Sequence, residues 1–126
     1  ARRGAVLVCG GLGGVMAAAA RGAKEAGGCT LGVLPGKTRD DVNPYIDYAV
    51  VTQMGHARNA IIVLTADVLI AVAGGYGTLS EIALALKNGK RVFGIRVPFA
   101  IPGLIVADTA KGAVDRAFAA LAESVR

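Results

Sequence analysis

Residues 68–81 have the sequence VLIAVAGGYGTLSE, which is the most informative segment of the chain for its fold. Its first part, Val68 to Val72, is an unbroken apolar run, which is typical of a strand buried on both faces of a parallel sheet. Three glycines follow within a short loop, and the segment from about Thr78 to Asn88 is then predicted to be a helix. A strand, a glycine loop and a helix in this order favour an α/β nucleotide-binding domain.

The same alternation runs through the rest of the chain. We expect strands at Ala5–Cys9, Thr30–Leu34, Ala49–Thr52, Val68–Val72, Arg91–Ile95 and Leu104–Ala107. We expect helices at Val15–Ala26, Ala57–Ala66, Thr78–Asn88 and from a cap at Asp108 or Thr109 to Ser124. Strands that alternate with helices imply βαβ units with right-handed crossovers. The predicted fold is a Rossmann-like, doubly wound, mostly parallel sheet with helices on both faces, in a single domain spanning residues 1–126.

Composition narrows the class of protein. The chain has 126 residues, is 54% hydrophobic and contains 18 glycines, which suits one α/β domain with functional glycine loops. Its net charge is +5, but the basic residues are scattered, so we expect no nucleic-acid partner. No apolar run reaches the roughly 18 residues of a membrane span, and we expect a cytoplasmic protein with no membrane partner.

The few sulfur and imidazole groups argue against a metal site. Cys9 and Cys29 each lie inside an apolar run and are predicted to be buried thiols of a cytosolic protein rather than a disulfide. His56 is the single histidine, and the sequence contains no CxxC pair. We therefore expect no bound metal and no other resident cofactor.

A further glycine loop, Gly10 to Gly14, follows the strand expected at Ala5–Cys9. It lacks the GxGxxG spacing and the Lys and Ser/Thr of a P-loop, which disfavours ATP hydrolysis of that type. Its backbone N–H groups and the positive end of the next helix suit an anion, although a tight turn explains the glycines equally well. Ligands of open α/β sheets bind beyond the carboxyl ends of the strands, where both glycine loops are expected.

Two explanations fit the carboxylate of Glu81. Gly74, Gly75 and Gly77 permit a ligand to approach the backbone, and the Thr78 hydroxyl is placed to bond a phosphate, with Glu81 about one helical turn further on. Alternatively, Thr78 to Glu81 is a T-x-x-E capping box, in which Glu81 only satisfies the backbone N–H of Thr78.

These motifs resemble those of the LOG (Lonely guy) family. Residues 74–81 are similar to the family's PGGxGTxxE signature, and residues 10–16 are similar to its GGGxxGLM loop. Arg58 lies nine residues before Asp67, in the Met-x-x-x-Arg context that the family's catalytic arginine has. The resemblance covers nearly the whole chain, with the motifs in the family's order.

The resemblance implies a nucleoside 5′-monophosphate phosphoribohydrolase, which hydrolyses the N-glycosidic bond to free base and ribose 5-phosphate. Arg58 and Glu81 would be the catalytic pair, because a carboxylate can stabilise the oxocarbenium-like state of glycosidic cleavage. A homodimer or a higher homo-oligomer is implied as well. The implied ligand- and phosphate-binding residues are Gly10, Gly11, Gly13, Gly14, Met16, Gly74, Gly75, Tyr76, Gly77 and Thr78.

Three positions depart from the LOG pattern. Ala73 replaces the signature proline, Asn59 replaces the lysine that follows the arginine, and Leu12 stands where the motif has a third glycine. These departures, together with residues 25–35, are closer to a bacterial LOG-related branch that includes molybdenum-cofactor carrier proteins. Such carriers bind a phosphate-bearing pterin without turning it over. The alternative function is therefore a non-catalytic carrier or sensor of a phosphorylated nucleotide or pterin.

The roles of two side chains are left open, and the first residues of the chain are unusual for this fold. Arg58 is either the catalytic arginine of the resemblance or a helix-surface charge, and Tyr76 either stacks on a ligand or is simply exposed. The chain begins Ala-Arg-Arg-Gly, which looks like the end of a helix, whereas a domain of this type normally opens with a strand. We therefore expect that a leading strand and helix are absent from this chain.

Overall fold

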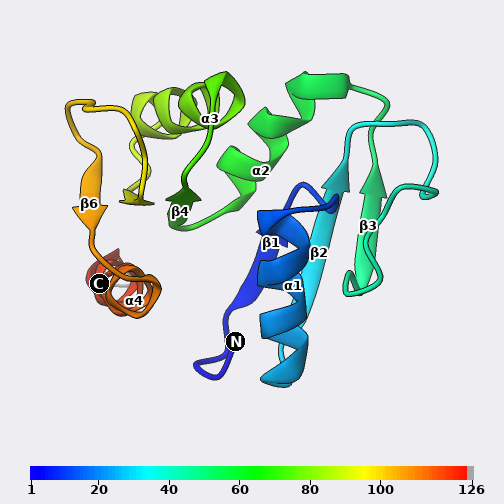
Figure 1. The fold of residues 1–126 in the computed structure, drawn as a ribbon, viewed down its shortest axis with the longest axis horizontal. Coiled ribbons are helices and arrows are strands. Elements are labelled where there is room, and N and C mark those ends of the chain that lie inside the picture. The colour runs from blue at the N-terminus through cyan, green and yellow to red at the C-terminus, as the bar shows by residue number, and fades with distance from the viewer. Residues whose placement is uncertain (125–126) are drawn as a thin grey trace. The chain divides into compact units, whose positions relative to one another are not determined.

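The computed structural model describes residues 1–124 and divides the chain into two compact units, Ala1–Ile62 (unit 1) and Val63–Arg126 (unit 2) (Figure 1). Each unit contains a three-stranded parallel sheet, and one helix lies between the first two of its strands. The α/β, Rossmann-like fold class predicted from the sequence is confirmed. The expectation of a single domain stays a prediction.

Unit 1 is built on a parallel sheet in the order β1-β2-β3. Its elements are β1 (Val6–Cys9), α1 (Val15–Glu25), β2 (Cys29–Leu34), β3 (Tyr48–Val51) and the 3₁₀ turn η1 (Gly55–Arg58). Helix α1 packs against β1 and β2. Because the three strands are parallel, their carboxyl ends meet at one edge of the sheet, and the first glycine loop leaves β1 there.

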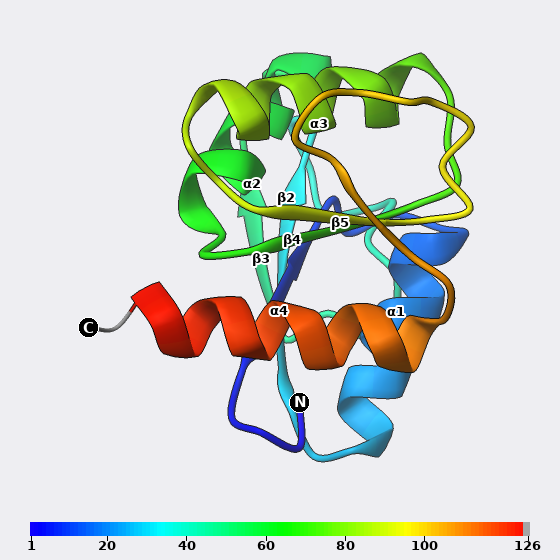
Figure 2. The same cartoon turned by 90° about the vertical axis from the view of Figure 1, so that its left-hand side faces the viewer.

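Unit 2 is built on a second parallel sheet, in the order β4-β5-β6. Its elements are β4 (Leu69–Val72), α3 (Tyr76–Lys87), β5 (Val92–Ile95), β6 (Ile105–Ala107) and α4 (Ala110–Ser124). Helix α2 (Asn59–Thr65) begins in unit 1 and ends in unit 2. Figure 2 shows α3 on one side of β4 and β5, and α4 on the other.

Two apolar clusters hold unit 2 together, one on each face of its sheet. Phe93 and Ile95 of β5 pack with three buried alanines of α4. Val92, also of β5, packs on the opposite face with Ile82 and Ala85 of α3. Phe93 and Ile95 belong to one cluster and Val92 to the other because successive side chains of a strand point to opposite faces of the sheet. The apolar run at β5 is therefore typical of a strand that is covered on both faces.

Glycines end two of the helices, α1 and α3. After α1, Gly27 has φ +76°, its N–H donates to Lys24 O at 3.0 Å, and Gly28 N–H donates to Ala23 O at 2.8 Å. After α3, Gly89 has φ +75° and takes part in the same pair of bonds. These are Schellman motifs, in which a left-handed residue turns the chain so that the last carbonyls of the helix are satisfied.

Two expectations differ from the structure in detail. The helix expected at Ala57–Ala66 begins instead as the 3₁₀ turn η1, and Arg58 is the last residue of that turn. Cys9 and Cys29 are free thiols, but each is half buried rather than buried. In the strand register Val6 pairs with Cys29, so the two sulfur atoms belong to opposite ends of the β1-β2 pair. Within residues 1–124, no helix is long and apolar enough to cross a membrane.

Candidate functional site

The second glycine loop leads directly into the amino end of α3. Gly75 is the N-cap residue, with φ −112° and ψ −144°, and no side chain caps the helix. The Leu79 N–H donates to Gly75 O at 3.0 Å, which is the first bond of the helical pattern. The N–H groups of Tyr76, Gly77 and Thr78 therefore have no acceptor one turn earlier in the helix. Together with the positive end of the helix dipole, they suit an anion.

The T-x-x-E capping box, one of the two explanations for Glu81, is not formed. Thr78 is the third residue of α3, whereas the box requires it at the N-cap position. Gly75 occupies that position because Gly74, at φ +111°, turns the chain before Thr78 is reached. Glu81 is half buried and lies one turn beyond Thr78, so helix capping of this kind does not explain its carboxylate.

Gly74 and Thr78 are packed against each other. A Cβ atom on Gly74 would lie 2.0 Å from Thr78 Oγ1 and 2.3 Å from Thr78 Cβ, so only glycine fits there. Gly75 and Gly77, in contrast, are exposed and have open space where a Cβ atom would be. Tyr76, between them, is 89% exposed. The five residues of the predicted phosphate cradle thus lie together at one accessible helix end.

Ala73 explains one departure from the LOG pattern. Its φ is +50°, and its N–H donates to Ile95 O of β5 at 2.8 Å. Proline fixes φ near −65° and has no N–H, so it fits neither the conformation nor the hydrogen bond. The chain therefore enters this glycine loop by a backbone path that the signature proline cannot follow.

The first half of the Gly10 to Gly14 loop is packed against side chains of unit 1. A Cβ atom on Gly10 would lie 2.6 Å from Met16 Sδ and 2.7 Å from Arg58 Nη2. On Gly11, which has φ +76°, it would lie 2.7 Å from Leu34 Cδ2. Both glycines are buried. Close packing explains these two glycines, and Met16 lies beneath the loop.

The second half of the same loop is open. Gly13 and Gly14 are exposed, with nothing near the position of a Cβ atom. Gly14, at φ +64°, is the N-cap of α1, and no side chain caps this helix. The Ala18 N–H donates to Gly14 O at 3.0 Å, so the N–H groups of residues 15–17 have no acceptor one turn earlier in the helix. This is a second helix end with the geometry that suits an anion.

Asn43 holds the first loop in place, a role not predicted from the sequence. Its backbone N–H donates to Gly11 O and its Nδ2 donates to Leu12 O, each at 2.9 Å, while its Oδ1 accepts the Tyr45 N–H at 3.0 Å. The residue is buried. The available signal was an asparagine directly before a proline, since asparagine side chains often bond the backbone of turns. The segment that follows β2 and ends at Pro44 is thus bonded to the glycine loop.

Arg58 lies beneath the first loop rather than on a helix surface. Arg58 is only 8% exposed, so the alternative that it is a charge on a helix surface is wrong. Its Nη1 donates to Asn59 Oδ1, and in the part of the chain that the structure describes, its Nε is a buried donor with no hydrogen-bond partner. A buried charge with an unmade hydrogen bond is costly unless an acceptor arrives. Arg58 therefore marks the surroundings of Gly10 as a place where a ligand is expected.

Cys9 is the last residue of β1, and the pKa of its thiol depends on its burial and, to a smaller extent, on the positive charge of Arg58. Burial raises the pKa of the Cys9 thiol, and the opposing effects of the Gly11 backbone and the Arg58 charge are smaller. The thiol is therefore protonated at neutral pH. Because the thiolate is the nucleophilic form of cysteine, Cys9 is not a candidate nucleophile.

Unit 2 has a hollow of about 400 Å³ at the carboxyl edge of its sheet. The residues that line it are Val72, Ile95, Arg96, Asp108, Thr109 and Ala110. Thr109 Oγ1 accepts the Gly112 N–H at 2.9 Å, which confirms Thr109 as the predicted cap of α4. Arg96 and Asp108 were not predicted as site residues, because no glycine loop or motif marks the ends of their strands.

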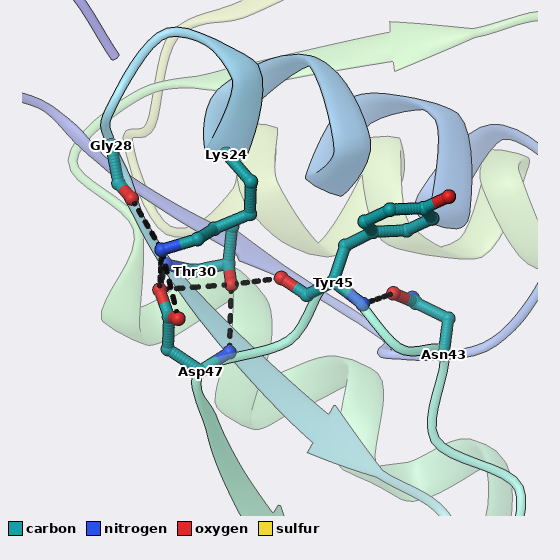
Figure 3. Close-up of polar contacts among 6 residues, drawn as sticks. All are labelled: Lys24, Gly28, Thr30, Asn43, Tyr45 and Asp47. Atoms are coloured by element: carbon teal, nitrogen blue, oxygen red, sulfur yellow. Dashed lines mark hydrogen bonds and ion pairs between the residues drawn. The ribbon is translucent and has the colours of Figure 1, made fainter.

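Polar contacts at the amino end of the unit 1 sheet are structural (Figure 3). Thr30 is fully buried; its N–H donates to Asp47 Oδ2 at 2.9 Å, and its hydroxyl donates to Tyr45 O at 2.6 Å. Lys24 Nζ, at the end of α1, lies 2.9 Å from Asp47 Oδ1. The hydrogen bond from Lys24, followed by that from the Thr30 backbone, holds the pKa of Asp47 below its usual value. These bonds join α1, β2 and the start of β3, away from the glycine loop.

The predicted site residues meet within each unit. In unit 1, Met16 and Arg58 both contact Gly10. In unit 2, the residues from Gly74 to Thr78 and Glu81 share the first turns of α3. The pairing of Arg58 with Glu81 joins different units and stays a prediction. Over residues 1–124, no group of three His, Cys, Asp or Glu side chains is arranged to hold a metal ion.

Parallel α/β sheets whose glycine loops lead into uncapped helix ends define a Rossmann-like protein with sites suited to anionic ligands. The chain belongs to the SLOG cluster4 family, whose model matches residues 1–121. The resemblance to LOG-like proteins predicted from the two glycine motifs is confirmed.

Similar proteins narrow the branch of this superfamily. An uncharacterised protein of Archaeoglobus fulgidus is 53% identical over 115 residues, which cover 91% of this chain and 76% of that protein. The molybdenum cofactor binding protein of Rippkaea orientalis has a TM-score of 0.83 at 37% identity, covering 98% of this chain and 78% of its own. The molybdenum cofactor carrier protein of Chlamydomonas reinhardtii has a TM-score of 0.83 at 38% identity, covering 95% and 80%. The branch predicted from the departures from the LOG pattern is confirmed.

Proposed function

We propose that this protein is a non-catalytic carrier of a small phosphorylated pterin of the molybdenum-cofactor class. The observation that carries the proposal is the likeness of nearly the whole chain to two proteins whose names state that they bind or carry that cofactor. The identities of 37% and 38% extend over 98% and 95% of this chain.

The phosphate of the cargo binds at the amino end of α3. The N–H groups of residues 76–78 and the Thr78 hydroxyl are the donors, and the helix dipole adds roughly half a positive charge at this end. Gly75 and Gly77 are exposed and open, which leaves room for phosphate oxygens next to the backbone. Binding of this type needs no reacting group, which suits a carrier.

Besides its phosphate, the cargo contains a ring system and a metal, which require different kinds of contact. Tyr76 is 89% exposed beside the phosphate position, and its ring offers a face to a flat heterocycle. In the part of the chain that the structure describes, no group of three His, Cys, Asp or Glu side chains is arranged to hold a metal ion. The residues named above would therefore bind the pterin and the phosphate of the cargo.

Hydrolysis of nucleoside 5′-monophosphates is the second candidate function. Glu81 favours it, because the expected capping box is not formed and the carboxylate lies one turn along α3 from the phosphate position. Two observations favour the carrier instead. Arg58 is buried beneath the first loop, and Ala73 has a backbone conformation that the signature proline of the LOG hydrolases cannot adopt.

Fluorescence titration with an oxidised, metal-free pterin phosphate tests the carrier. We expect binding, and a loss of at least about tenfold in affinity when the ligand has been treated with phosphatase. Thr78→Val, which removes the hydroxyl at nearly constant shape, is expected to weaken binding about 5- to 10-fold. Ser80→Ala is the matched control, because it removes an exposed hydroxyl from the same helix. Equal affinity for the two forms of the ligand would contradict the phosphate site.

Incubation with a panel of nucleoside 5′-monophosphates separates the two functions. The carrier is expected to release no free base, as measured by chromatography. Release that is abolished by Glu81→Gln and retained by Ser80→Ala would establish the hydrolase and overturn the carrier.

We further propose a cytoplasmic homodimer or higher homo-oligomer, as the family resemblance implies. Light scattering of the purified chain across a concentration series measures the oligomeric state. A mass near 12.7 kDa at all concentrations would contradict it.

A further inference from the structure

We propose that the hollow at the carboxyl edge of the unit 2 sheet binds the ring of a pterin, with Asp108 accepting hydrogen bonds from ring N–H groups and Arg96 donating to the ring carbonyl oxygen. This ring site rests on the proposed function, because the cargo phosphate is taken to bind at the amino end of α3. It adds the contacts that select the ring. A stacking contact with Tyr76 suits any flat heterocycle and does not distinguish one ring from another.

The hollow has the size and the apolar walls of a small-ligand site. Its volume is about 400 Å³, and pockets that hold small ligands have roughly 300–1,000 Å³. Val72 and Ile95, the last residues of β4 and β5, line it together with Ala110 at the start of α4. Aliphatic walls of this kind suit a flat aromatic ring.

Two charged side chains of opposite sign line the same hollow. Arg96 directly follows β5 and Asp108 directly follows β6, so the pairing of these parallel strands brings both residues to one edge of the sheet. Both are exposed, and within residues 1–124 neither side chain takes part in a hydrogen bond or an ion pair. A positive donor and a negative acceptor are therefore available to one ligand.

These two charges fit one edge of a pterin ring. On that edge a carbonyl oxygen, a ring N–H and an amino group stand side by side, which gives one acceptor followed by two donors. A carboxylate accepts two parallel N–H bonds, and a guanidinium group donates to a carbonyl oxygen. Adenine presents an amino donor beside a ring-nitrogen acceptor, so it offers Asp108 no such pair of donors. The hollow is therefore suited to a pterin ring and not to adenine.

The hollow and the phosphate position share one backbone segment. Val72 lines the hollow, and Gly74 and Gly75 follow it on the way into α3. The Ala73 N–H donates to Ile95 O at 2.8 Å, which fixes this segment to the strand at the wall of the hollow. The ring and the phosphate of one ligand therefore bind on two sides of the same short loop.

Titration calorimetry with two ligands tests the ring site. The first is 6-hydroxymethylpterin phosphate, and the second is the corresponding lumazine phosphate, in which an oxygen replaces the amino group of the ring. We expect the pterin form to bind at least about tenfold more tightly. Asp108→Asn is expected to reduce this preference to about twofold or less. Asp67→Asn, which changes an exposed carboxylate just before β4, is the matched control and is expected to keep it.

A second variant tests the donor. Asparagine tolerates the φ of +54° at position 96, and both ligands keep the carbonyl oxygen, so Arg96→Asn is expected to bind each about fivefold more weakly with the preference unchanged. If the wild type bound both phosphates equally and still required the phosphate, the ring site would be overturned while the proposed function stood. Binding of neither ligand would overturn both.

Guanosine 5′-monophosphate separates the two sources of this hydrogen-bonding edge, because guanine has the same oxygen, N–H and amino group. We expect it to bind more weakly than the pterin phosphate, as the proposed function requires. Tighter binding of the guanine nucleotide, lost in Asp108→Asn, would overturn the pterin as the occupant of the hollow.

Discussion

The two units contain the same motif, a strand, a glycine loop and a helix, yet they hold it in place by different means. In unit 1 the loop is packed over Arg58 and bonded from the side by Asn43. In unit 2 the loop is held by its own backbone, with Gly74 at φ +111° against the Thr78 side chain. In the first loop Gly10 is required for packing alone, whereas Gly11, at φ +76°, is required for packing and conformation, as Gly74 is in the second loop. The motif alone therefore does not say what each glycine does.

Gly74→Ala is expected to have the largest effect. The new Cβ would meet Thr78 at 2.0 Å, and alanine is strained at φ +111°, so we expect a loss of about 2–4 kcal/mol in the free energy of unfolding. Urea denaturation measures it. Gly75→Ala is the matched control, because it has open space and no positive φ, and is expected to lie within about 0.5 kcal/mol of the wild type. Similar losses in both variants would show that the second loop is not held by glycine geometry.

Gly10→Ala tests the packed loop of unit 1. Its Cβ would lie 2.6 Å from Met16 Sδ and 2.7 Å from Arg58 Nη2, so we expect a loss of about 1–3 kcal/mol. Both contacts are ends of side chains, which can shift, so the effect is expected to be smaller than at Gly74. Adding Met16→Ala should make the combined loss less than the sum of the two single losses. Strict additivity, or an equal loss in Gly13→Ala, would contradict the packing explanation.

Asn43→Ala tests the bonds that exist only in unit 1. The variant keeps the backbone bond to Gly11 but removes the partners of Leu12 O and Tyr45 N–H, so we expect a loss of about 1–2 kcal/mol. Hydrogen exchange should become faster in the first glycine loop and stay unchanged at residues 75–78. Faster exchange in both loops would mean that Asn43 acts on overall stability and not on its own loop.

The smallest expected effect is the acid sensitivity of unit 1. The pKa of Asp47 is lowered in the folded state by Lys24 and Thr30, so its contribution to stability is present above the ordinary value of about 3.9 and is lost as pH falls through the lowered pKa. Asp47→Asn should therefore be less stable than the wild type at neutral pH, and the difference should shrink as the solution becomes acidic. Denaturation across pH measures this. Asp41→Asn, an exposed carboxylate of the same unit, is the control, and a constant difference for Asp47→Asn would rule out the charge effect.

Much of the fold follows from the sequence, while parts of the candidate site do not. The strands and helix ends were predicted to within a few residues, because apolar runs and terminal glycines act locally. The start of α3 was misplaced by two residues, since Gly74, Gly75 and Thr78 all suit the end of a loop and only the positive φ at Gly74 settles which of them caps the helix. The burial of Arg58 had no sequence signal, because its neighbours in the chain do not form its surroundings.

The order of strands and helices, the positions of both glycine loops and the family could all be inferred from the sequence. These features depend on periodicity, on the backbone freedom of glycine and on short motifs, all of which are local. The burial of Arg58 against Gly10, and the bond from Asn43 to the loop 31 residues away, arise from the folded structure. Both arise because parallel strands bring the loops at their carboxyl ends to one edge, where residues distant in the chain supply each other's partners.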